Sequence, residues 1–296
     1  MRAVPDDLRP VLSAGRRLEV LGLGPDTGPA LVFHSGTPSA AVPFPPLVAA
    51  AEAAGLRLVT WSRPGYGDSE PAPGRTVADV AADSVAVLDA LGVDEFVTLG
   101  WSGGGPHALA CAALIPGRCR AAATLAGVAP YGADGLDWLA GMGEENVEEF
   151  SLAVRGEQSL TPWLEEQAAV LSGVRGADVA ASLGGLVSPV DTASVTGEFA
   201  EYLAAGFRRA VATGVAGWRD DDLAFVRDWG FDLAAIEIPV SVWQGGQDLM
   251  VPPAHGRWLA DAIPTARDHI HPGVGHLSLA VASIDRIVAD LARPAA

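Results

Sequence analysis

The chain has 296 residues, of which 49% are hydrophobic, and its 36 acidic and 19 basic residues give a formal net charge of −17 at pH 7. This length and apolar content suffice for one large hydrophobic core and are typical of an α/β protein with an insertion. The excess of negative charge argues against nucleic acid, an anionic membrane surface or a polyphosphate ligand as a partner.

The two cysteines, Cys111 and Cys119, favour a reduced compartment, because they are too few for a disulfide framework and lack the spacing of metal ligands. Residues 1–15 contain Pro5 and Pro10, where a signal peptide needs an uninterrupted apolar stretch. No apolar run is long enough to cross a bilayer. We therefore expect a cytoplasmic protein with no metal and no membrane partner.

The first half of the chain alternates short apolar runs with helical patterns. Such alternation with short links predicts a mostly parallel sheet with helices on both faces. The predicted strands cover residues 17–22, 30–33, 58–61, 96–100 and 121–125, and the predicted helices cover residues 44–54, 77–91 and 103–114.

After residue 129 the alternation stops, and residues 130–217 contain helical patterns but no convincing strand. We expect one helix to begin at Thr161-Pro162, with acidic residues in its first turn, and another to cover residues 191–207. We interpret residues 130–217 as a helical cap inserted into a core domain formed by residues 1–129 and 218–296. Within that core, the strand and helix order resumes with predicted elements at 240–244, 254–262, 267–271 and 277–292.

A β-branched run, residues 96–99, leads into Gly100-Trp101-Ser102-Gly103-Gly104 and then into a helical pattern. A Gly-x-Ser-x-Gly turn between a strand and a helix is typical of a nucleophile elbow, in which the serine hydroxyl stands clear of the sheet. The positive end of the following helix points at that hydroxyl. Ser102 is therefore the candidate nucleophile.

A serine hydroxyl needs a base within hydrogen-bond reach, itself oriented by a third group. His276 lies in a glycine-rich loop before the last predicted helix, so its side chain can reach the carboxyl edge of the sheet. Asp248 leaves the strand 240–244 by a glycine turn and is the candidate acid; its alternative role is to cap the helix near residue 252. Asp134 is the first carboxylate after the strand ending at residue 125 and is the second candidate.

The oxyanion of an acyl-transfer reaction needs two backbone N–H donors. Gly103, directly after the candidate nucleophile, is expected to provide one of them. Thr37 is expected to provide the other, with Gly36 allowing the bend of its loop and Pro38 fixing the exit. We expect His34 to support this loop through hydrogen bonds.

With these residues assigned, the chain resembles the α/β-hydrolase superfamily over nearly its whole length, and in particular its small cofactor-independent esterases with a helical cap. The resemblance rests on segments 34–38, 63–69, 100–104, 245–248 and 275–276. It implies the α/β-hydrolase fold, a mostly parallel sheet flanked by helices with a helical cap insertion. Two departures are Ser62, where the family usually has Asp before Arg-Pro-Gly, and Ser35, which splits the usual His-Gly pair.

The resemblance argues against the epoxide hydrolases and haloalkane dehalogenases of the same fold, because their alkyl-enzyme chemistry requires a carboxylate at the position of Ser102. The glycine-rich stretch Gly103-Gly104-Gly105-Pro106 lacks the Lys-Ser/Thr of a phosphate-binding loop. No cofactor is implied.

We therefore predict a serine hydrolase that cleaves a carboxylic ester, with an amide or thioester as alternatives, of a small and mainly apolar substrate. Two other hypotheses remain open at this stage: a triad-bearing natural-product enzyme (cyclase, carbon–carbon bond lyase or cofactor-free oxygenase), and a ligand-binding protein on a hydrolase scaffold. Aromatic side chains near the elbow and in the cap are expected to line the substrate pocket: Trp101, Trp138, Trp163, Phe199, Tyr202 and Phe207.

Residues 130–222 contain sixteen Asp or Glu and five Arg. A negative field at the mouth of a cleft repels ligands of like charge. We therefore expect neutral or cationic esters to be preferred over anionic ones.

Overall fold

The computed structural model describes residues 8–25 and 27–293, whose strands form one sheet in the order β1-β2-β4-β3-β5-β6-β7-β8. The two N-terminal strands run antiparallel to their neighbours and the other six run parallel, as the alternating pattern predicts. The strands are β1 (Leu8–Ser13), β2 (Arg16–Leu23), β3 (Ala30–His34), β4 (Arg57–Ser62), β5 (Phe96–Trp101), β6 (Cys119–Leu125), β7 (Val240–Gly245) and β8 (Ala266–His271).

Strand β1 is absent from the sequence-based expectation. It contains Pro10, which a central strand does not tolerate but an edge strand does. The strand pairs with β2 through a tight turn at Ala14 and Gly15, both of which have positive φ angles, 48° and 80°.

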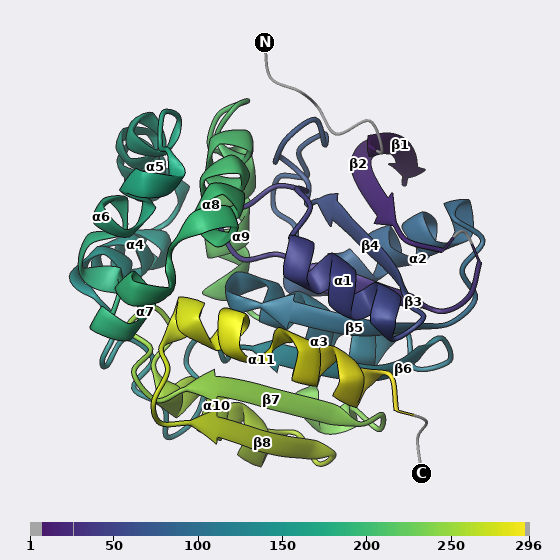
Figure 1. The fold of residues 1–296 in the computed structure, drawn as a ribbon. Helices are drawn as coiled ribbons and strands as arrows, with labels where there is room; N and C mark the ends of the chain where they lie inside the picture. The colour runs from purple at the N-terminus through teal and green to yellow at the C-terminus, as the bar shows by residue number, and fades with distance from the viewer. Residues whose placement is uncertain (1–7, 26, 294–296) are drawn as a thin grey trace.

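Five helices cover the two faces of the sheet (Figure 1). Helices α1 and α11 pack on one face, and α2, α3 and α10 pack on the other. Their bounds are α1 (Pro45–Ala53), α2 (Val80–Ala90), α3 (Gly105–Leu114), α10 (Pro253–Ala262) and α11 (His276–Leu291), with short 3₁₀ segments η1 (Val77–Asp79), η2 (Ser102–Gly104) and η5 (Leu233–Ala235).

The alternation of side chains along the strands builds two apolar layers. In β3, Leu31 and Phe33 join the layer that contains Leu47 of α1, whereas Val32 joins the layer that contains Leu109 of α3. All of these side chains are buried. The central strands are therefore fixed on both faces, which gives the loops at their carboxyl ends a rigid base.

Helices α4–α9, called the inserted helices below, lie between β6 and β7 in the chain. Figure 1 shows most of them gathered at the side of the sheet toward which the arrowheads of β7 and β8 point. They are α4 (Glu144–Arg155), α5 (Glu157–Leu171), α6 (Val179–Ser182), α7 (Pro189–Ser194), α8 (Gly197–Ala210) and α9 (Ala216–Phe225), with η3 (Gly176–Asp178) and η4 (Gly184–Leu186).

Two expected helices in this region have different bounds. Helix α5 begins at Glu157 and contains Pro162 in its interior, because Gly156, with a φ of 106°, ends α4 and starts α5 one turn earlier than expected. The helix expected over residues 191–207 is two helices, α7 and α8. The break falls at Val195 and Thr196, two β-branched residues outside helical geometry.

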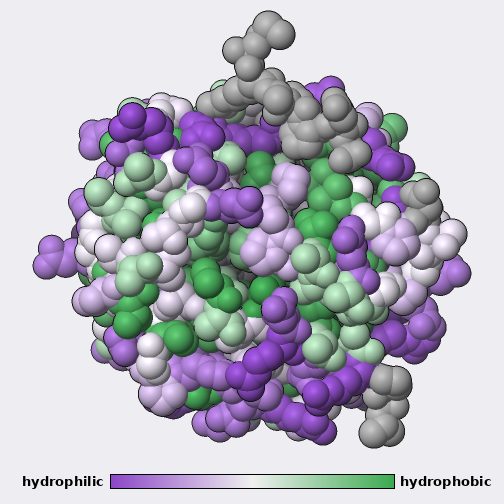
Figure 2. Space-filling view, viewed as in Figure 1, coloured by the Kyte–Doolittle hydropathy of each residue, from purple (hydrophilic) through white to green (hydrophobic). Residues whose placement is uncertain are grey.

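No helix among the described residues is long and apolar enough to cross a membrane. On the face viewed in Figure 2, hydrophobic and hydrophilic residues are interspersed. The signal-peptide expectation concerns residues 1–15, of which the first seven lie outside the described residues.

Candidate active site

Ser102 stands at a sharp turn between β5 and α3, at the carboxyl end of the sheet. Its φ of 54° is a left-handed value that residues other than glycine rarely adopt. The turn needs glycine at both flanking positions: a Cβ on Gly100 would lie 2.2 Å from the carbonyl oxygen of Gly104, and a Cβ on Gly104 would lie 2.0 Å from the carbonyl oxygen of His34. The local geometry is that of a nucleophile elbow.

His276 and Asp248 are hydrogen-bonded across the carboxyl ends of β7 and β8. His276 Nδ1 lies 2.8 Å from Asp248 Oδ2, and both side chains are buried. The other carboxylate oxygen of Asp248 accepts hydrogen bonds from the N–H groups of Met250 and Val251, at 2.9 and 2.8 Å. Asp248 thus pairs with the histidine and binds the main chain of the turn before α10 (Pro253–Ala262), but it does not cap that helix, whose N-cap residue is Pro252.

This pairing sets the proton affinity of the imidazole. Burial by itself lowers the pKa of His276, but the charge and hydrogen bond of Asp248, with a smaller contribution from Asp191, raise the pKa above its ordinary value. An imidazole bonded through Nδ1 to a carboxylate presents its Nε2 as a proton acceptor.

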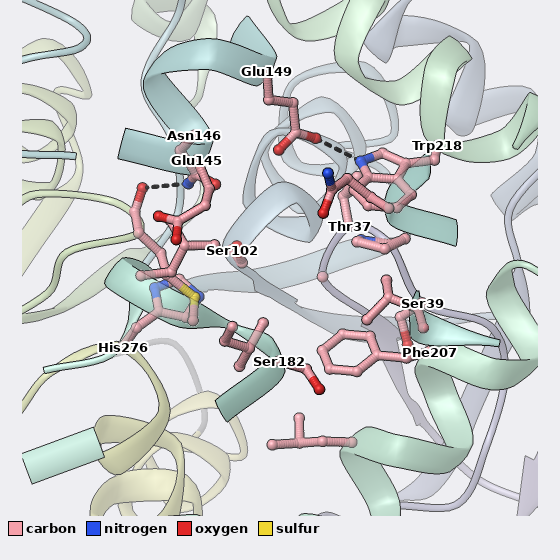
Figure 3. Close-up of a pocket in the computed structure, with 18 of the residues that line it drawn as sticks. Thr37, Ser39, Ser102, Glu145, Asn146, Glu149, Ser182, Phe207, Trp218 and His276 are labelled. Atoms are coloured by element: carbon pink, nitrogen blue, oxygen red, sulfur yellow. Dashed lines mark hydrogen bonds between the residues drawn. The ribbon is translucent and has the colours of Figure 1, made fainter. Parts of the chain in front are cut away.

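Ser102 and His276 line the same cavity (Figure 3). Four of the expected pocket aromatics also line it: Trp101, Trp163, Tyr202 and Phe207. The Trp101 ring is roughly parallel to the His276 ring, with 6.1 Å between the centroids. The candidate nucleophile, the candidate base and an apolar wall therefore meet in one place.

The other two expected pocket residues are not among the described residues that line this cavity. Trp138 packs edge-on against Phe150 and His255, and its Nε1 donates to the carbonyl of Ala129 at 2.7 Å. Phe199 stacks on Trp101, with ring centroids 6.2 Å apart. The expectation that these two side chains line the pocket is therefore corrected: they pack against residues of the pocket wall and the core.

Thr37 and Gly103, the expected oxyanion donors, are in close contact beside Ser102. A Cβ on Gly103 would lie 2.5 Å from Thr37 Oγ1, and one on Gly36 would lie 3.4 Å from Ser102 Cβ. Gly103 is the second residue of η2, so its N–H has no acceptor within the helix. The arrangement brings the two residues expected to donate beside the candidate nucleophile Ser102.

His34 does not hold this loop in the way that the sequence suggests. Its Nε2 lies 3.6 Å from Cys111 Sγ, and its ring packs edge-on against Trp61. Burial, followed by the charges of neighbouring His107 and Arg63, holds its pKa well below the usual value. His34 is therefore a neutral, buried histidine beneath the loop.

Arg63 holds the loop instead. Its Nη1 donates to the carbonyl of Ser35 at 2.6 Å, and its Nη2 donates to the carbonyl of Gly36 at 3.2 Å and to Thr37 Oγ1 at 2.9 Å. One guanidinium thus fixes three successive loop residues. The planar, always charged Arg side chain suits this multiple contact.

Asp221, from α9, is the anion beneath this loop and was not predicted. Its carboxylate accepts hydrogen bonds from Arg63 and Arg75 (2.6 Å each), Thr37 Oγ1 (2.9 Å) and the Tyr66 hydroxyl (3.0 Å). Burial alone raises the pKa of Asp221, but the two arginines hold it well below its usual range. The loop of residues 35–37, which contains the expected donor Thr37, is thereby tied to α9.

Replacing Asp221 with asparagine is expected to lower the free energy of unfolding by about 3–5 kcal/mol, because two buried guanidinium groups lose their counter-charge. Urea unfolding measures this. The matched control is Asp89→Asn, which breaks a pair with Arg118 of similar length, 2.7 Å, in which the aspartate is 63% exposed; its cost is expected to be about 1 kcal/mol or less. Equal losses of unfolding free energy in the two variants would contradict the role of Asp221 as a buried counter-ion.

The pairing of Asp221 with Arg63 and Arg75 also predicts that part of the free energy of unfolding is lost in acid. The folded-state pKa of Asp221 lies below its unfolded value of about 3.9. Its contribution is therefore fully present above the unfolded pKa and is lost as the pH falls through the folded-state value.

Asp191, from α7, is a second unpredicted carboxylate, and it binds the backbone of the candidate base. It accepts the N–H groups of His276, Leu277 and Ser278 at 3.0, 2.9 and 2.8 Å, and also the Ser278 and Ser188 hydroxyls at 2.8 and 2.9 Å. A carboxylate at this place satisfies the free N–H groups at the start of α11 and the positive end of its dipole. One inserted helix thus fixes the position of His276.

Asp191→Asn is expected to lower kcat by about 10- to 100-fold for a reaction in which His276 is the base, through misplacement of His276. Loss of the negative charge also lowers the His276 pKa, so the acidic limb of the kcat/KM profile moves to lower pH. The control is Glu198→Gln, which removes an exposed charge from the start of α8. If kcat falls but the acidic limb of the kcat/KM profile stays at the same pH, Asp191 has only a structural role.

The remaining groups of this region show no arrangement for metal binding. Among the described residues, no group of three or more His, Cys, Asp or Glu side chains is placed to hold an ion. Cys111 and Cys119 are free and buried, and His255 is bonded to the main chain of Ala129 and Trp138.

Known proteins provide an independent comparison. "Epoxide hydrolase B" of Mycobacterium tuberculosis is 27% identical over 168 residues, which cover 54% of this chain and 46% of that protein. The chain thus matches less than half the length of this curated relative.

Solved structures match over nearly the full chain. A hydrolase from Pseudomonas aeruginosa PA01 has a TM-score of 0.69 at 23% identity, with 97% of each chain covered. The enol-lactonase from Burkholderia xenovorans LB400 has a TM-score of 0.66 at 22% identity, with 96% of this chain and 99% of that chain covered.

At this level of identity these structures establish the fold alone. The family model described as the alpha/beta hydrolase fold matches residues 29–282. The mostly parallel sheet flanked by helices agrees with this match and confirms the predicted fold class. The chain therefore belongs to the α/β-hydrolase fold family of hydrolases.

Proposed function

We propose that this protein is a serine hydrolase that cleaves a carboxylic ester of a small, mainly apolar substrate through an acyl-enzyme. The observation that carries the proposal is the 2.8 Å hydrogen bond between His276 and Asp248, with His276 and the elbow residue Ser102 on one cavity. The inserted helices act as a cap over this site. Two of them contribute the Trp163 and Phe207 walls.

In the proposed reaction, Ser102 Oγ attacks the ester carbonyl while His276 Nε2 takes its proton. Asp248 holds the Nδ1–H and stabilises the imidazolium. The oxyanion is bound by the N–H groups of Thr37 and Gly103. His276 then returns the proton to the leaving alcohol, and water hydrolyses the acyl-enzyme with His276 again as the base.

The serine at position 102 separates this proposal from epoxide opening. The epoxide hydrolases of this fold form an alkyl-enzyme ester on a carboxylate, and the nucleophile position here carries a hydroxyl. A hydroxyl with a paired imidazole favours acyl transfer. The resemblance to the enol-lactonase, whose name denotes cleavage of a cyclic ester, is consistent with this chemistry.

Stopped-flow mixing with a short-chain p-nitrophenyl ester tests the proposal. An acyl-enzyme mechanism predicts a burst of p-nitrophenol that matches the enzyme concentration, followed by slower turnover. Release of p-nitrophenol no faster than in buffer would instead favour a ligand-binding protein on this scaffold.

A further inference from the structure

Helix α4 of the inserted helices brings carboxylates into the cavity that holds Ser102. Glu145, Asn146 and Glu149 line the cavity, and Glu145 and Glu149 lie one helical turn apart (Figure 3). None of the described residues that line the cavity is an arginine, and the chain contains no lysine. The cavity therefore has an acidic wall with no arginine or lysine among the described residues that line it.

Glu149 is the more deeply placed of the two, with 7% of its surface exposed. Its Oε1 accepts a hydrogen bond of 2.6 Å from Trp218 Nε1, and Trp218 also lines the cavity. The hydrogen bond fixes the carboxyl beside an aromatic ring. An acid in this position is aimed by the protein and does not extend into solvent.

Asp222 lies behind Glu149 and is fully buried; apart from the neighbouring Glu149 carboxyl, neither of its carboxylate oxygens has a hydrogen-bond donor among the described residues. Burial and the neighbouring charge of Glu149 raise the pKa of Asp222 well above its usual value, and burial likewise raises the pKa of Glu149. Two carboxyl groups in contact titrate as a pair, and burial favours their neutral forms. A cation bound beside Glu149 would favour the ionised form of this pair.

Glu145 adds a second open acceptor. Its Oε1 accepts the N–H of Gly185 at 2.8 Å, whereas its Oε2 is buried and has no hydrogen-bond partner among the described residues. A buried carboxylate oxygen without a donor costs free energy unless a ligand supplies the missing partner.

Aromatic rings complete this part of the cavity. Trp163 and Trp218 meet edge to face with centroids 6.4 Å apart, and Tyr202 and Phe207 also line the wall. Aromatic faces attract cations, most strongly when water is excluded. Carboxylates and indole rings in one pocket are the chemistry that recognises a substituted ammonium group.

We propose that Glu145, Glu149, Trp163 and Trp218 form a subsite for a positively charged nitrogen, so that the natural substrate is an ester with an apolar body and an ammonium group remote from the scissile carbonyl. That the substrate is an ester rests on the proposed function; the binding of a positively charged nitrogen does not. The subsite itself is a binding property and is testable without turnover.

Binding to the Ser102→Ala variant tests the subsite directly. Choline and 3,3-dimethylbutan-1-ol have nearly the same shape and differ in the charge of one atom. The subsite predicts that choline binds at least about tenfold more tightly, by calorimetry or tryptophan fluorescence. Equal binding, or tighter binding of the neutral alcohol, would overturn the proposal whatever the protein hydrolyses.

Turnover of the corresponding acetate esters tests the link to catalysis. The wild-type protein is expected to show a kcat/KM ratio of cationic to neutral ester above about ten, and Glu149→Gln and Glu145→Gln are each expected to reduce that ratio severalfold. Glu148→Gln, an exposed position on the same helix, is the matched control and should leave the ratio unchanged. Hydrolysis of both esters with a ratio near one would overturn the subsite and leave the esterase proposal intact.

The salt dependence of the preference for the cationic ester distinguishes direct contact in the cavity from long-range attraction by the acidic inserted helices. Attraction by the acidic inserted helices as a whole weakens as the Debye length shrinks, whereas a contact inside the cavity is screened much less. The subsite predicts that most of the preference persists in 0.5 M salt. A ratio that falls to one would assign the preference to the surface field instead.

Discussion

Replacing Ser102 with alanine is expected to lower kcat for ester hydrolysis by about 10⁴- to 10⁶-fold, because no other group in the elbow can form the acyl-enzyme. The fold should be retained, since alanine meets the same backbone cost as serine at a φ of 54°. Turnover of a p-nitrophenyl ester and the circular dichroism spectrum measure the two effects.

The control for this variant is Ser39→Ala, because Ser39 also lines the cavity but its hydroxyl makes only a 3.4 Å contact with a neighbouring carbonyl. It should retain most of the activity. A Ser102→Ala protein with more than about one hundredth of the wild-type kcat would be incompatible with the proposed nucleophile.

Asp248→Asn is expected to reduce kcat by about 10²- to 10⁴-fold while the protein stays folded. The asparagine oxygen can still accept the N–H groups of Met250 and Val251, so its NH₂ group then faces His276 Nδ1. That contact favours the tautomer with the proton on Nε2, which cannot take a proton from Ser102. Steady-state kinetics and thermal unfolding separate this effect from a loss of structure.

Asp134→Asn serves as the control, because Asp134 was the second candidate for this role. The structure places Asp134 at an exposed position, where its main-chain carbonyl accepts a hydrogen bond from Trp258. Its replacement should leave kcat unchanged. A larger loss in Asp134→Asn than in Asp248→Asn would reverse the assignment.

The three proposed triad residues could be predicted because each has a local signal. Ser102 lies between glycines that the elbow requires, and Asp248 and His276 each follow glycines that end a strand. Parallel strands in a sheet bring such loops to one edge, so the chain order of the strands was enough to group the three residues.

Asp221 and Asp191 could not be predicted in the same way. Asp221 lies 158 residues from Arg63, and Asp191 lies 85 residues from His276. Nothing in the neighbouring residues distinguishes them from the other acids of the region, because their partners are set by how the inserted helices pack on the sheet. At the departure Ser62, the hydroxyl accepts the N–H of Ala41 at 2.9 Å and donates to Glu19 Oε2 at 2.7 Å.

The inserted helices were the least predictable part for a related reason. Their first and last residues depend on single glycine and β-branched positions, such as Gly156 and Val195, where the proline signal at Pro162 suggested another start. The position of Trp138 was equally hard to predict. Its aromatic ring suggested a pocket residue, but its indole N–H donates a hydrogen bond to the main-chain carbonyl of Ala129.

Covalent labelling by a serine-reactive fluorophosphonate tests the role of Ser102 as the nucleophile without any knowledge of the substrate. We expect a single phosphonylated residue, Ser102, identified by mass spectrometry of the digested protein, and no labelling of the Ser102→Ala variant. Labelling that persists in the variant, or that falls on another residue of the wild-type protein, would show that Ser102 is not the reactive serine.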